Sequence, residues 1–418
     1  MSLFGARNAA ELGMKAQSHG LNLISQNVAN TNTTGYKQTE SQFKTMLERS
    51  TVSQDYFGVR ASDRQLITKQ GQIKTTGDPL DLAINGQGFF QVQQSLQAEE
   101  TTTTMYTRDG AFSRGRAPDG DMYLKDSDGN FVMGREAPPE GAAPDAPTPD
   151  SLKPLSLTAV ETIDAKPTTE VRLQENIPNK PAGENLQTGV GVVGPEGKRQ
   201  TLGLIWSQNP DTANGWNLEV APKGGTTNSI NGNNTSTLPV TFGGNGELQT
   251  VDGQNTTSFD TTVTWGNGSQ STINLDLAGS TQLGEERQRV AVDDNGNLAG
   301  DLQRLEFDSQ GVLHGNYTNG EQRRLYEIPV TDFNNPRGLE PQSGTTWQYT
   351  ARAGERQVLT PQGINSRTGF VPSAVERSNV ELEDQFTRMI TTQKAYSSVA
   401  SAYQTADEMT QTATQLKS

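Results

Sequence analysis

The sequence LFGARNAAELGMKAQSHGLNLISQNV, residues 3–28, places mostly apolar side chains at steps of three and four. This spacing keeps them on one face of an α-helix and is typical of a coiled-coil seam. The residues of this stripe are Leu3, Ala6, Ala10, Met14, Gln17, Leu21, Ile24 and Val28.

A second stripe with the same spacing lies near the other end of the chain. A helix cannot bury such a stripe alone, so each terminal helix needs a partner. The partner is either the other end of the same chain or another copy of it. Ala and Gln at several positions make both stripes weakly hydrophobic, and this favours many-sided packing in an assembly. The second stripe consists of Leu382, Phe386, Met389, Gln393, Tyr396, Ala400 and Tyr403.

Length and composition bound the fold. A chain of 418 residues is too long for one small core, so we expect two to four domains. Only 31% of the residues are hydrophobic and 6% are aromatic, which is low for a large globular enzyme. The 43 glycines, with many Thr, Asn and Ser residues, indicate short strands joined by tight turns. The net charge of −14 offers no basic stripe and argues against nucleic-acid binding.

The sequence offers little to catalysis or metal binding. There is no cysteine, which excludes disulfides and Cys-type zinc sites and fits an exported protein. The two histidines, His19 and His314, are too few for a His-rich metal site and make a Ser-His-Asp triad improbable, so we expect structural roles. We predict no catalytic, cofactor-binding or metal-binding residue.

Two acidic runs superficially suggest calcium loops. The run that begins at Asp126 lacks the glycine at the sixth position, where Phe131 stands, and the glutamate at the twelfth, where Ala137 stands. A hairpin turn is the better interpretation of 126–130, and the same holds for 293–297.

No stretch of the sequence is long and apolar enough to span a membrane. The first five residues do not start a basic region followed by an apolar core, so no cleaved signal is predicted. If the chain is exported, we expect a route that needs no such signal.

The region between the two helices reads as β-structure. Residues 41–71 are polar and weakly patterned, and we expect an extended arm there. Strand patterns follow at 80–92, 106–112 and 122–133. Six prolines in residues 137–154 predict a stiff linker and a domain boundary.

An all-β domain is predicted after the linker, over residues 155–283. Residues 202–206 should pair with 216–220, and 263–265 with 273–277. Strands at 302–313 and 325–330 should complete the earlier sheet, so that the second domain is inserted into the first. The C-terminal helix should start at Ser378 and Asn379, both good N-cap residues, and extend to Lys417 over roughly 58 Å.

Four stretches of the sequence combine glycine, asparagine and aromatic residues in specific patterns. They are, in chain order, Asn27–Lys37 with Asn30, Gly35 and Tyr36; Asp81–Phe90 with Asp81, Gly86, Gly88, Phe89 and Phe90; Tyr106–Phe112; and Ser378–Leu382 followed by Met389–Tyr396, with Ser378 and Asn379. In this order the four stretches resemble the motifs of the bacterial flagellar rod and hook proteins. The stretch at 332–340 resembles a segment typical of hook subunits, and Gln94–Met105 looks like a loop lengthened relative to the family.

The resemblance implies a mainly β fold with α-helical termini. Residues 1–30 and 379–418 would pair in a coiled coil, 31–75 and 355–378 would form a connecting arm, 76–150 and 284–354 a middle domain, and 155–283 an outer domain. The implied function is mechanical: a curved, flexible helical tube that transmits torque and surrounds an export channel. The implied partners are other copies of the chain, the distal rod protein, the hook-filament junction protein, the hook cap and the flagellar export apparatus, without insertion into a membrane.

Two alternatives remain open at this point. The chain is either a hook subunit or a distal-rod or junction protein of the same family. A reading from another class is an extracellular glycan-binding or hydrolytic protein, with Trp206, Trp216 and Trp265 on a sugar-binding face, although such tryptophans are more often core residues.

Overall fold

The computed structural model describes residues 3–49, 55–96, 104–139, 148–178, 185–284, 288–342, 345–359 and 368–415. The chain forms two compact units. The first unit holds residues 1–159, 305–315 and 323–418, and the second holds 160–304 and 316–322. Residues 97–103 of the lengthened loop and 140–147 of the proline-rich stretch lie outside the described residues.

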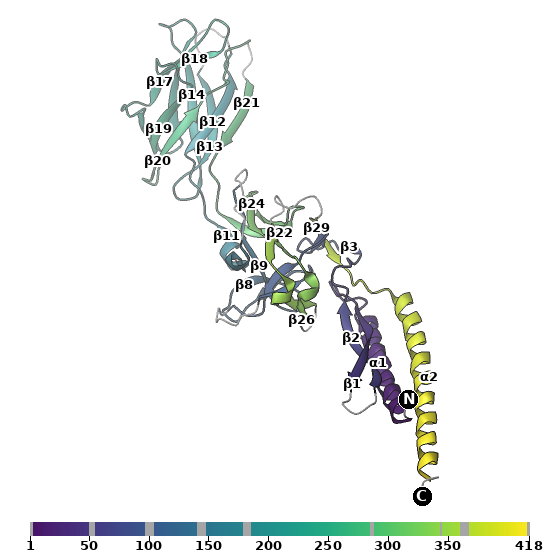
Figure 1. Cartoon of the computed structure of the whole chain (residues 1–418). Helices are drawn as coiled ribbons and strands as arrows, with labels where there is room; N and C mark the ends of the chain where they lie inside the picture. Colours follow the sequence, from purple (N-terminus) through teal and green to yellow (C-terminus); the bar gives the residue numbers. More distant parts are fainter. Residues whose placement is uncertain are drawn as a thin grey trace. The chain divides into compact units, whose positions relative to one another are not determined.

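The chain is mainly β, with one α-helix at each end, as predicted. Helix α1 spans Leu3–Ala29 and helix α2 spans Leu382–Gln415 (Figure 1). The 34 residues of α2 extend over about 51 Å. Among the described residues, neither helix is apolar enough over a sufficient length to cross a membrane.

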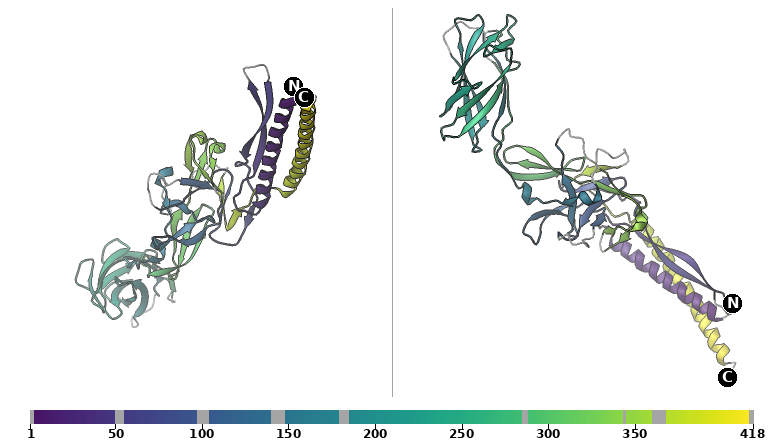
Figure 2. Two further views of the ribbon diagram at one scale, coloured as in Figure 1. Left: turned by 90° about the horizontal axis from the view of Figure 1, so that it is seen from below. Right: turned by 60° about the vertical axis from the view of Figure 1, so that its left-hand side comes forward.

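A long β-hairpin follows α1, where we had expected only an extended arm. Strands β1, Thr39–Arg49, and β2, Asp55–Gln65, are antiparallel, with Thr39 opposite Gln65 and Arg49 opposite Asp55. Both strands pack against α1, which lies between the hairpin and α2 (Figures 1 and 2). The prediction missed the hairpin because its sequence is polar and shows no clear alternation.

A large antiparallel sheet lies mainly in the first unit. Its strand order is β11-β22-β23-β24-β9-β5-β6-β27-β26; β10 and β8 also pair with β9, and β7 pairs with β8. The predicted hairpin at 122–133 is present as β8 and β9, whereas the predicted strand at 325–330 is two strands separated at Pro329. The bounds are β5 Phe90–Gln93, β6 Thr104–Thr107, β7 Ser113–Arg116, β8 Met122–Lys125, β9 Phe131–Glu136, β10 Lys153–Pro154, β11 Thr162–Ile163, β22 Gly300–Phe307, β23 Val312–Tyr317, β24 Gln322–Glu327, β26 Glu340–Pro341 and β27 Thr346–Gln348.

Three short strand pairs connect distant parts of the first unit. Strand β3, Ile73–Thr75, pairs with β30, Ala374–Glu376, and β4, Leu82–Asn85, pairs with β29, Gly369–Pro372. Strand β25, Val330–Phe333, pairs with β28, Arg356–Leu359. The two strands predicted within 80–92 are present as β4 and β5, and they pair with different neighbours rather than with each other.

The second unit is a β-sandwich whose sheets have the orders β16-β19-β20-β12-β21 and β13-β14-β15-β17-β18 (Figure 1). Both predicted antiparallel pairs are present: Trp206 lies opposite Leu218, and Val263 opposite Ser271. The bounds are β12 Glu170–Asn176, β13 Leu186–Val193, β14 Arg199–Gln208, β15 Gly215–Pro222, β16 Thr226–Ile230, β17 Thr237–Phe242, β18 Leu248–Val251, β19 Ser258–Thr264, β20 Gln270–Asp276 and β21 Gln288–Asp294.

The inserted region differs from the predicted range 155–283 at both ends. Leu155 is 1% exposed and its backbone N–H donates to Val132, so it belongs to the first unit. At the other end, β21 pairs with β12 and continues the outer sandwich beyond residue 283. The predicted borders of the inserted domain follow changes in composition, whereas the observed borders follow the pairing of the strands.

Alternating side chains of the two sheets fill the core of the sandwich. Trp206, Trp216 and Trp265 are 0%, 3% and 2% exposed and belong to this core. A sugar-binding face made of these tryptophans is therefore wrong.

Candidate assembly site

Residues from all four predicted motifs meet at one place in the first unit, which we call the junction. It is formed by the chain after α1, the loop after β6 and the chain before α2. Gly35 has φ +70° and lies so close to the β6 loop that a Cβ atom there would be 2.6 Å from the backbone nitrogen of Asp109. The N–H of Gly35 donates to the carbonyl of Glu376. A left-handed, close backbone approach of this kind favours glycine.

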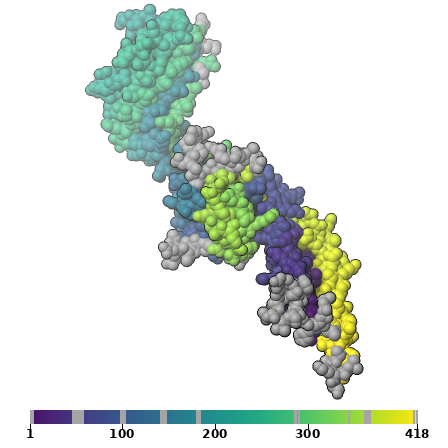
Figure 3. Space-filling model, viewed as in Figure 1, coloured from purple at the N-terminus to yellow at the C-terminus, as the bar shows by residue number. Residues whose placement is uncertain are grey.

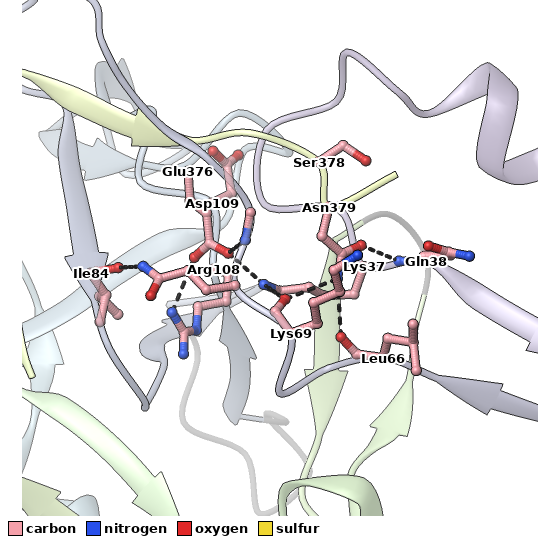
Figure 4. A network of polar contacts seen from close by, with 12 residues as sticks. Lys37, Gln38, Leu66, Lys69, Ile84, Arg108, Asp109, Glu376, Ser378 and Asn379 are labelled. Atoms are coloured by element: carbon pink, nitrogen blue, oxygen red, sulfur yellow. Dashed lines mark hydrogen bonds and ion pairs between the residues drawn. The ribbon is translucent and has the colours of Figure 1, made fainter. Parts of the chain in front are cut away.

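Three buried charges hold the junction together (Figure 4). Lys37 Nζ lies 2.5 Å from Glu376 Oε1, and Arg108 Nη1 lies 3.0 Å from Glu376 Oε2. The three side chains are 1%, 5% and 0% exposed for Lys37, Arg108 and Glu376. Arg108 also donates to the carbonyl of Gly86, and Lys37 to that of Lys69. One carboxylate thus joins two cations from separate motifs.

Burial shifts the titration of the charged groups in and beside the junction. Burial lowers the pKa of Lys37 to about 8, against the attraction of Glu376. Burial likewise lowers the pKa of Arg108. Burial raises the pKa of Asp109 to about 6, although Ser127 and the backbone N–H of Ala111 donate to its carboxylate. The junction is therefore sensitive to the loss of any charged partner.

The sequence predicts Ser378 and Asn379 as the N-cap of α2, but in the structure both residues belong to the junction. The side chain of Asn379 accepts the N–H of Gln38 and donates to the carbonyls of Leu66 and Lys69. The hydroxyl of Ser378 accepts the N–H of Val380. Because the side chain of Asn379 makes these three hydrogen bonds, it does not cap the helix, which starts three residues later, at Leu382.

The second motif fixes the sheet to the junction. The N–H of Gly86 donates to Gln70, and a Cβ atom at Gly88 would lie 2.0 Å from Val330 Cγ1. Phe89 packs edge-on against Phe333 and Trp347.

The remaining motif residues also make structural contacts. Phe90 is fully buried and packs against Phe112. The carboxylate of Asp81 accepts the hydroxyl of Thr76, and burial raises its pKa. Asn30 closes the end of α1 by donating to the carbonyl of Gln26.

The terminal helices run antiparallel and meet at intervals of seven residues. Asn27 Nδ2 donates to Gln385 Oε1 at 3.2 Å, Gly20 faces Thr392, and Gly13 faces Val399. Arg7 lies 3.6 Å from Asp407 near the far end. Asn27 also exchanges hydrogen bonds with the backbone of Thr39 and accepts the hydroxyl of Tyr36. Small and polar residues therefore form the contact between the two helices.

The buried face of α1 is rotated relative to the predicted stripe. Its buried residues include Ala16, Gly20, Leu23 and Asn27, none of which belongs to the predicted stripe. Ile24 is also buried and does belong to that stripe. Ala10, Met14, Leu21 and Val28 are half-buried beside this face, and the side chain of Leu3 lies outside the described residues. The hairpin and α2 cover different sides of α1, so no single stripe marks its buried surface.

The predicted stripe of α2 is largely exposed in the single chain. Leu382, Phe386 and Tyr396 are 41%, 51% and 38% exposed, while Met389 and Tyr403 are half-buried. The side chains that meet α1 are instead those of Gln385, Thr392 and Val399. Of the two partners left open by the sequence, the other end of the same chain therefore covers little of this stripe, and contact with another copy stays a prediction.

The groups considered for catalysis and metal binding have structural partners. His19 Nε2 lies 2.6 Å from Asp63, and His314 Nε2 lies 2.8 Å from Asp308. The carboxylate of Asp126 accepts the N–H groups of Asp128 and Asn130, which makes a hairpin turn as expected. Within the described part of the chain, no three His, Cys, Asp or Glu side chains are grouped to hold a metal ion.

Four protein-family models match successive parts of the chain. They are described as "Flagella basal body rod protein" for residues 8–37, "Flagellar hook protein FlgE/F/G D1 domain" for 83–165, "Flagellar basal body protein FlaE D2 domain" for 162–297 and "Flagellar basal body rod FlgEFG protein C-terminal" for 371–416.

The chain belongs to the flagellar rod and hook protein family. Flagellar hook protein FlgE of Brucella suis is 28% identical, and that of Rhizobium meliloti is 29% identical. Each alignment covers the whole of this chain and the whole of the relative. The solved Helicobacter pylori flagellar hook protein FlgE2 has a TM-score of 0.49 and 12% identity, with coverage of 71% of this chain and 98% of that one.

Within the family motifs, sequence reasoning did not single out Lys37, Arg108 and Asp109 as a cluster, and it missed Glu376. The signal that could have marked the first three is that they are the only charged residues of their two motifs, 27–37 and 106–112. Glu376 follows an ordinary short β-pattern, and its burial depends on contacts with segments more than 260 residues away.

Proposed function

We propose that this chain is the structural subunit of a bacterial flagellar hook. The observation that carries the proposal is the junction, where the N-terminal, sheet and C-terminal motifs of a rod and hook family protein join in one buried network. The match to hook proteins over the full length supports the hook over a rod or junction role.

In the proposed polymer, heterologous contacts between copies continue without closing and give a helical tube. The helix pair would form the inner wall around an export channel, and 31–75 with 355–378 a connecting layer. The sheet of the first unit would form a middle layer, and the sandwich the outer one. Sliding at soft contacts between copies would let the tube curve and bend while it transmits torque.

The expected partners follow from that place in the flagellum. They are other copies of the chain, the distal rod protein, the hook-filament junction protein, the hook cap and the export apparatus. Export would proceed without a cleaved signal, and the protein would reside outside the cell. We propose no catalytic role.

Electron microscopy of basal bodies from cells that lack this chain tests the proposal. Complete rods without a hook are expected. Truncated rods would move the protein into the rod, and intact hooks with filaments would refute an axial role.

The assembly residues are proposed from exposure. Leu382, Phe386 and Tyr396 are open in a single copy, so contact with other copies is the expected way to cover them. A chain that ends at Glu381 keeps Ser378 and Asn379 in the junction but lacks α2. This truncated chain should fail to polymerise while the sandwich stays folded, as measured by sedimentation and near-UV circular dichroism. Normal tubes from it would contradict the proposal.

A further inference from the structure

One flank of α2 carries a row of large apolar side chains, which we call the ridge. Leu382, Phe386 and Ile390 stand four residues apart, so they follow one another along the helix surface. They are 41%, 51% and 54% exposed. Figure 3 shows α2, in yellow, as an open surface beside α1. Three neighbouring large apolar residues in water are typical of a contact that a second molecule completes.

A groove of about 620 Å³ lies where α1, the β1–β2 hairpin and α2 meet. Its α1 side consists mainly of Ala and Gly, so an incoming side chain can approach close to the helix backbone. Phe43 and Val59 form the hairpin side and are themselves 49% and 37% exposed. Val399 and Ala402 belong to the α2 side. The groove is therefore apolar and shaped to accept bulky side chains.

The ridge and the groove lie on opposite flanks of α2. Gln385 and Val399 mark the direction of α1 at their respective levels of the helix. An α-helix turns by about 100° per residue. Phe386 follows Gln385 by one residue and so points about 100° to one side of α1. Ala402 follows Val399 by three residues and so points about 60° to the other side. The two surfaces therefore cannot meet within one chain. When two copies join through them, each copy keeps one free surface, and the contact repeats without closing.

The two surfaces are also displaced along the helix. Sixteen residues separate Phe386 from Ala402, which is about 24 Å along the axis. If two copies run in the same direction and the ridge of one contacts the groove of the other, the second copy is shifted along the helix axis by about 24 Å. A lateral contact with an axial stagger generates a helical array.

We propose that the ridge of one copy inserts into the groove of a second copy, with Phe386 as the central side chain. This assignment rests on the proposed polymeric function and names the contact that builds the polymer. The occupant of the groove is another copy of this chain, since that copy carries an exposed apolar row on the opposite flank of its α2.

Disulfide cross-linking of the full-length chain tests the assignment. The chain has no cysteine, so the double variant Phe386→Cys with Ala10→Cys carries only the two introduced thiols. Ala10 lines the groove near Ala402, about 24 Å along the helix pair from Phe386 in the same chain, so a disulfide can form only between copies. Oxidised polymers should give a ladder of multimers on a non-reducing gel.

The matched control is Thr387→Cys with Ala10→Cys. Thr387 is exposed and adjacent to Phe386, but it points about 100° away from it. Cross-linking of the Phe386 pair at least tenfold above the Thr387 pair is expected. Equal cross-linking in normal polymers overturns the ridge-to-groove contact and leaves the hook proposal intact. Failure of the unmodified chain to form any polymer, in cells or in solution, counts against the hook proposal itself.

A mixing experiment covers the case in which the cysteine variants do not polymerise. Ala10→Trp fills the groove and keeps the ridge, while Phe386→Ser removes the ridge and keeps the groove. Each variant alone should remain monomeric with an unchanged circular dichroism spectrum. Their mixture should form a dimer and stop, because only one productive contact remains. Polymers from either variant alone, or a mixture that stays monomeric, would overturn the proposal.

Discussion

Lys37 Nζ and Glu376 Oε1 lie 2.5 Å apart although 339 residues separate them in the sequence, and neither side chain is more than 1% exposed. Arg108 completes the network on the second carboxylate oxygen. Taking away one member of a buried ion pair is strongly destabilising, because the remaining charge is left without compensation. The folding of the junction therefore requires both ends of the chain to be in place together.

Replacing Glu376 by Gln should destabilise the first unit by about 3–5 kcal/mol, since Lys37 and Arg108 would remain as buried cations. The urea-unfolding transition of that unit at pH 7 measures the change. The matched control is Lys69→Met, which breaks the exposed Lys69–Glu381 pair, 49% and 62% exposed. It should cost at most about 1 kcal/mol. Equal losses in the two variants would show that the buried network contributes no more than a surface pair.

Local patterns in the sequence were sufficient for the helices and for several hairpins. The alternation around Trp206 and Trp216 predicted an antiparallel pair, because side chains at every second position share one face of a strand. The same reasoning failed for the β1–β2 hairpin, whose polar strands derive their order from pairing with each other and from packing on α1.

The assembly site was predictable only in part. Helical periodicity identifies an apolar face but does not say which neighbour covers it. In α2 the large apolar residues Phe386 and Ile390 are exposed, while Gln385 and Val399 meet α1. The junction could not be derived from local patterns, since Glu376 acquires its role only from cations distant in the sequence.

The pH dependence of stability should contain a contribution from Asp109. Burial raises its pKa to about 6, above the ordinary value of 3.8. Between these values the folded state binds more protons than the unfolded state, so this contribution favours folding at low pH and is lost as the pH rises through about 6. Asp109→Asn cannot ionise and retains an acceptor for the N–H of Ala111. It should therefore unfold at higher urea than the natural chain at pH 7, by on the order of 2 kcal/mol, with little difference near pH 4.

The control for this measurement is Asp119→Asn, which changes an exposed carboxylate of the same unit. It should leave the pH profile of stability unchanged. A natural chain whose stability does not fall relative to Asp109→Asn between pH 4 and 7 would refute the role assigned to Asp109.

Gly35→Ala should disrupt the junction, whereas Gly77→Ala should not. Both glycines have positive φ, +70° and +85°, so both substitutions carry the backbone cost of about 1 kcal/mol. Only at Gly35 would the new Cβ clash, at 2.6 Å from the backbone of Asp109, because nothing lies within 4 Å at Gly77. Thermal unfolding of the first unit should therefore shift further for Gly35→Ala. Equal shifts would mean that the junction can open enough to accept a methyl group.

Two tryptophans in the core of the sandwich differ in one hydrogen bond. Trp265 Nε1 donates to Ser271 at 2.8 Å, whereas the buried Nε1 of Trp206 has no hydrogen-bond partner among the described residues. Replacement by Phe removes the same atoms and a similar volume at both sites. Trp265→Phe additionally leaves the hydroxyl of Ser271, 8% exposed, without its donor. It should destabilise the sandwich by about 1–2 kcal/mol more than Trp206→Phe.

The unfolding transition of the second unit, followed by the fluorescence of the remaining tryptophans, measures this difference. Adding Ser271→Ala to Trp265→Phe removes the stranded hydroxyl and should recover part of the loss, because replacing both partners by apolar groups leaves no unpaired polar atom. If Trp206→Phe proves the more damaging substitution, shape and packing around the indole outweigh its hydrogen bond. In that case the unpaired indole of Trp206 is retained for the volume it fills between the two sheets.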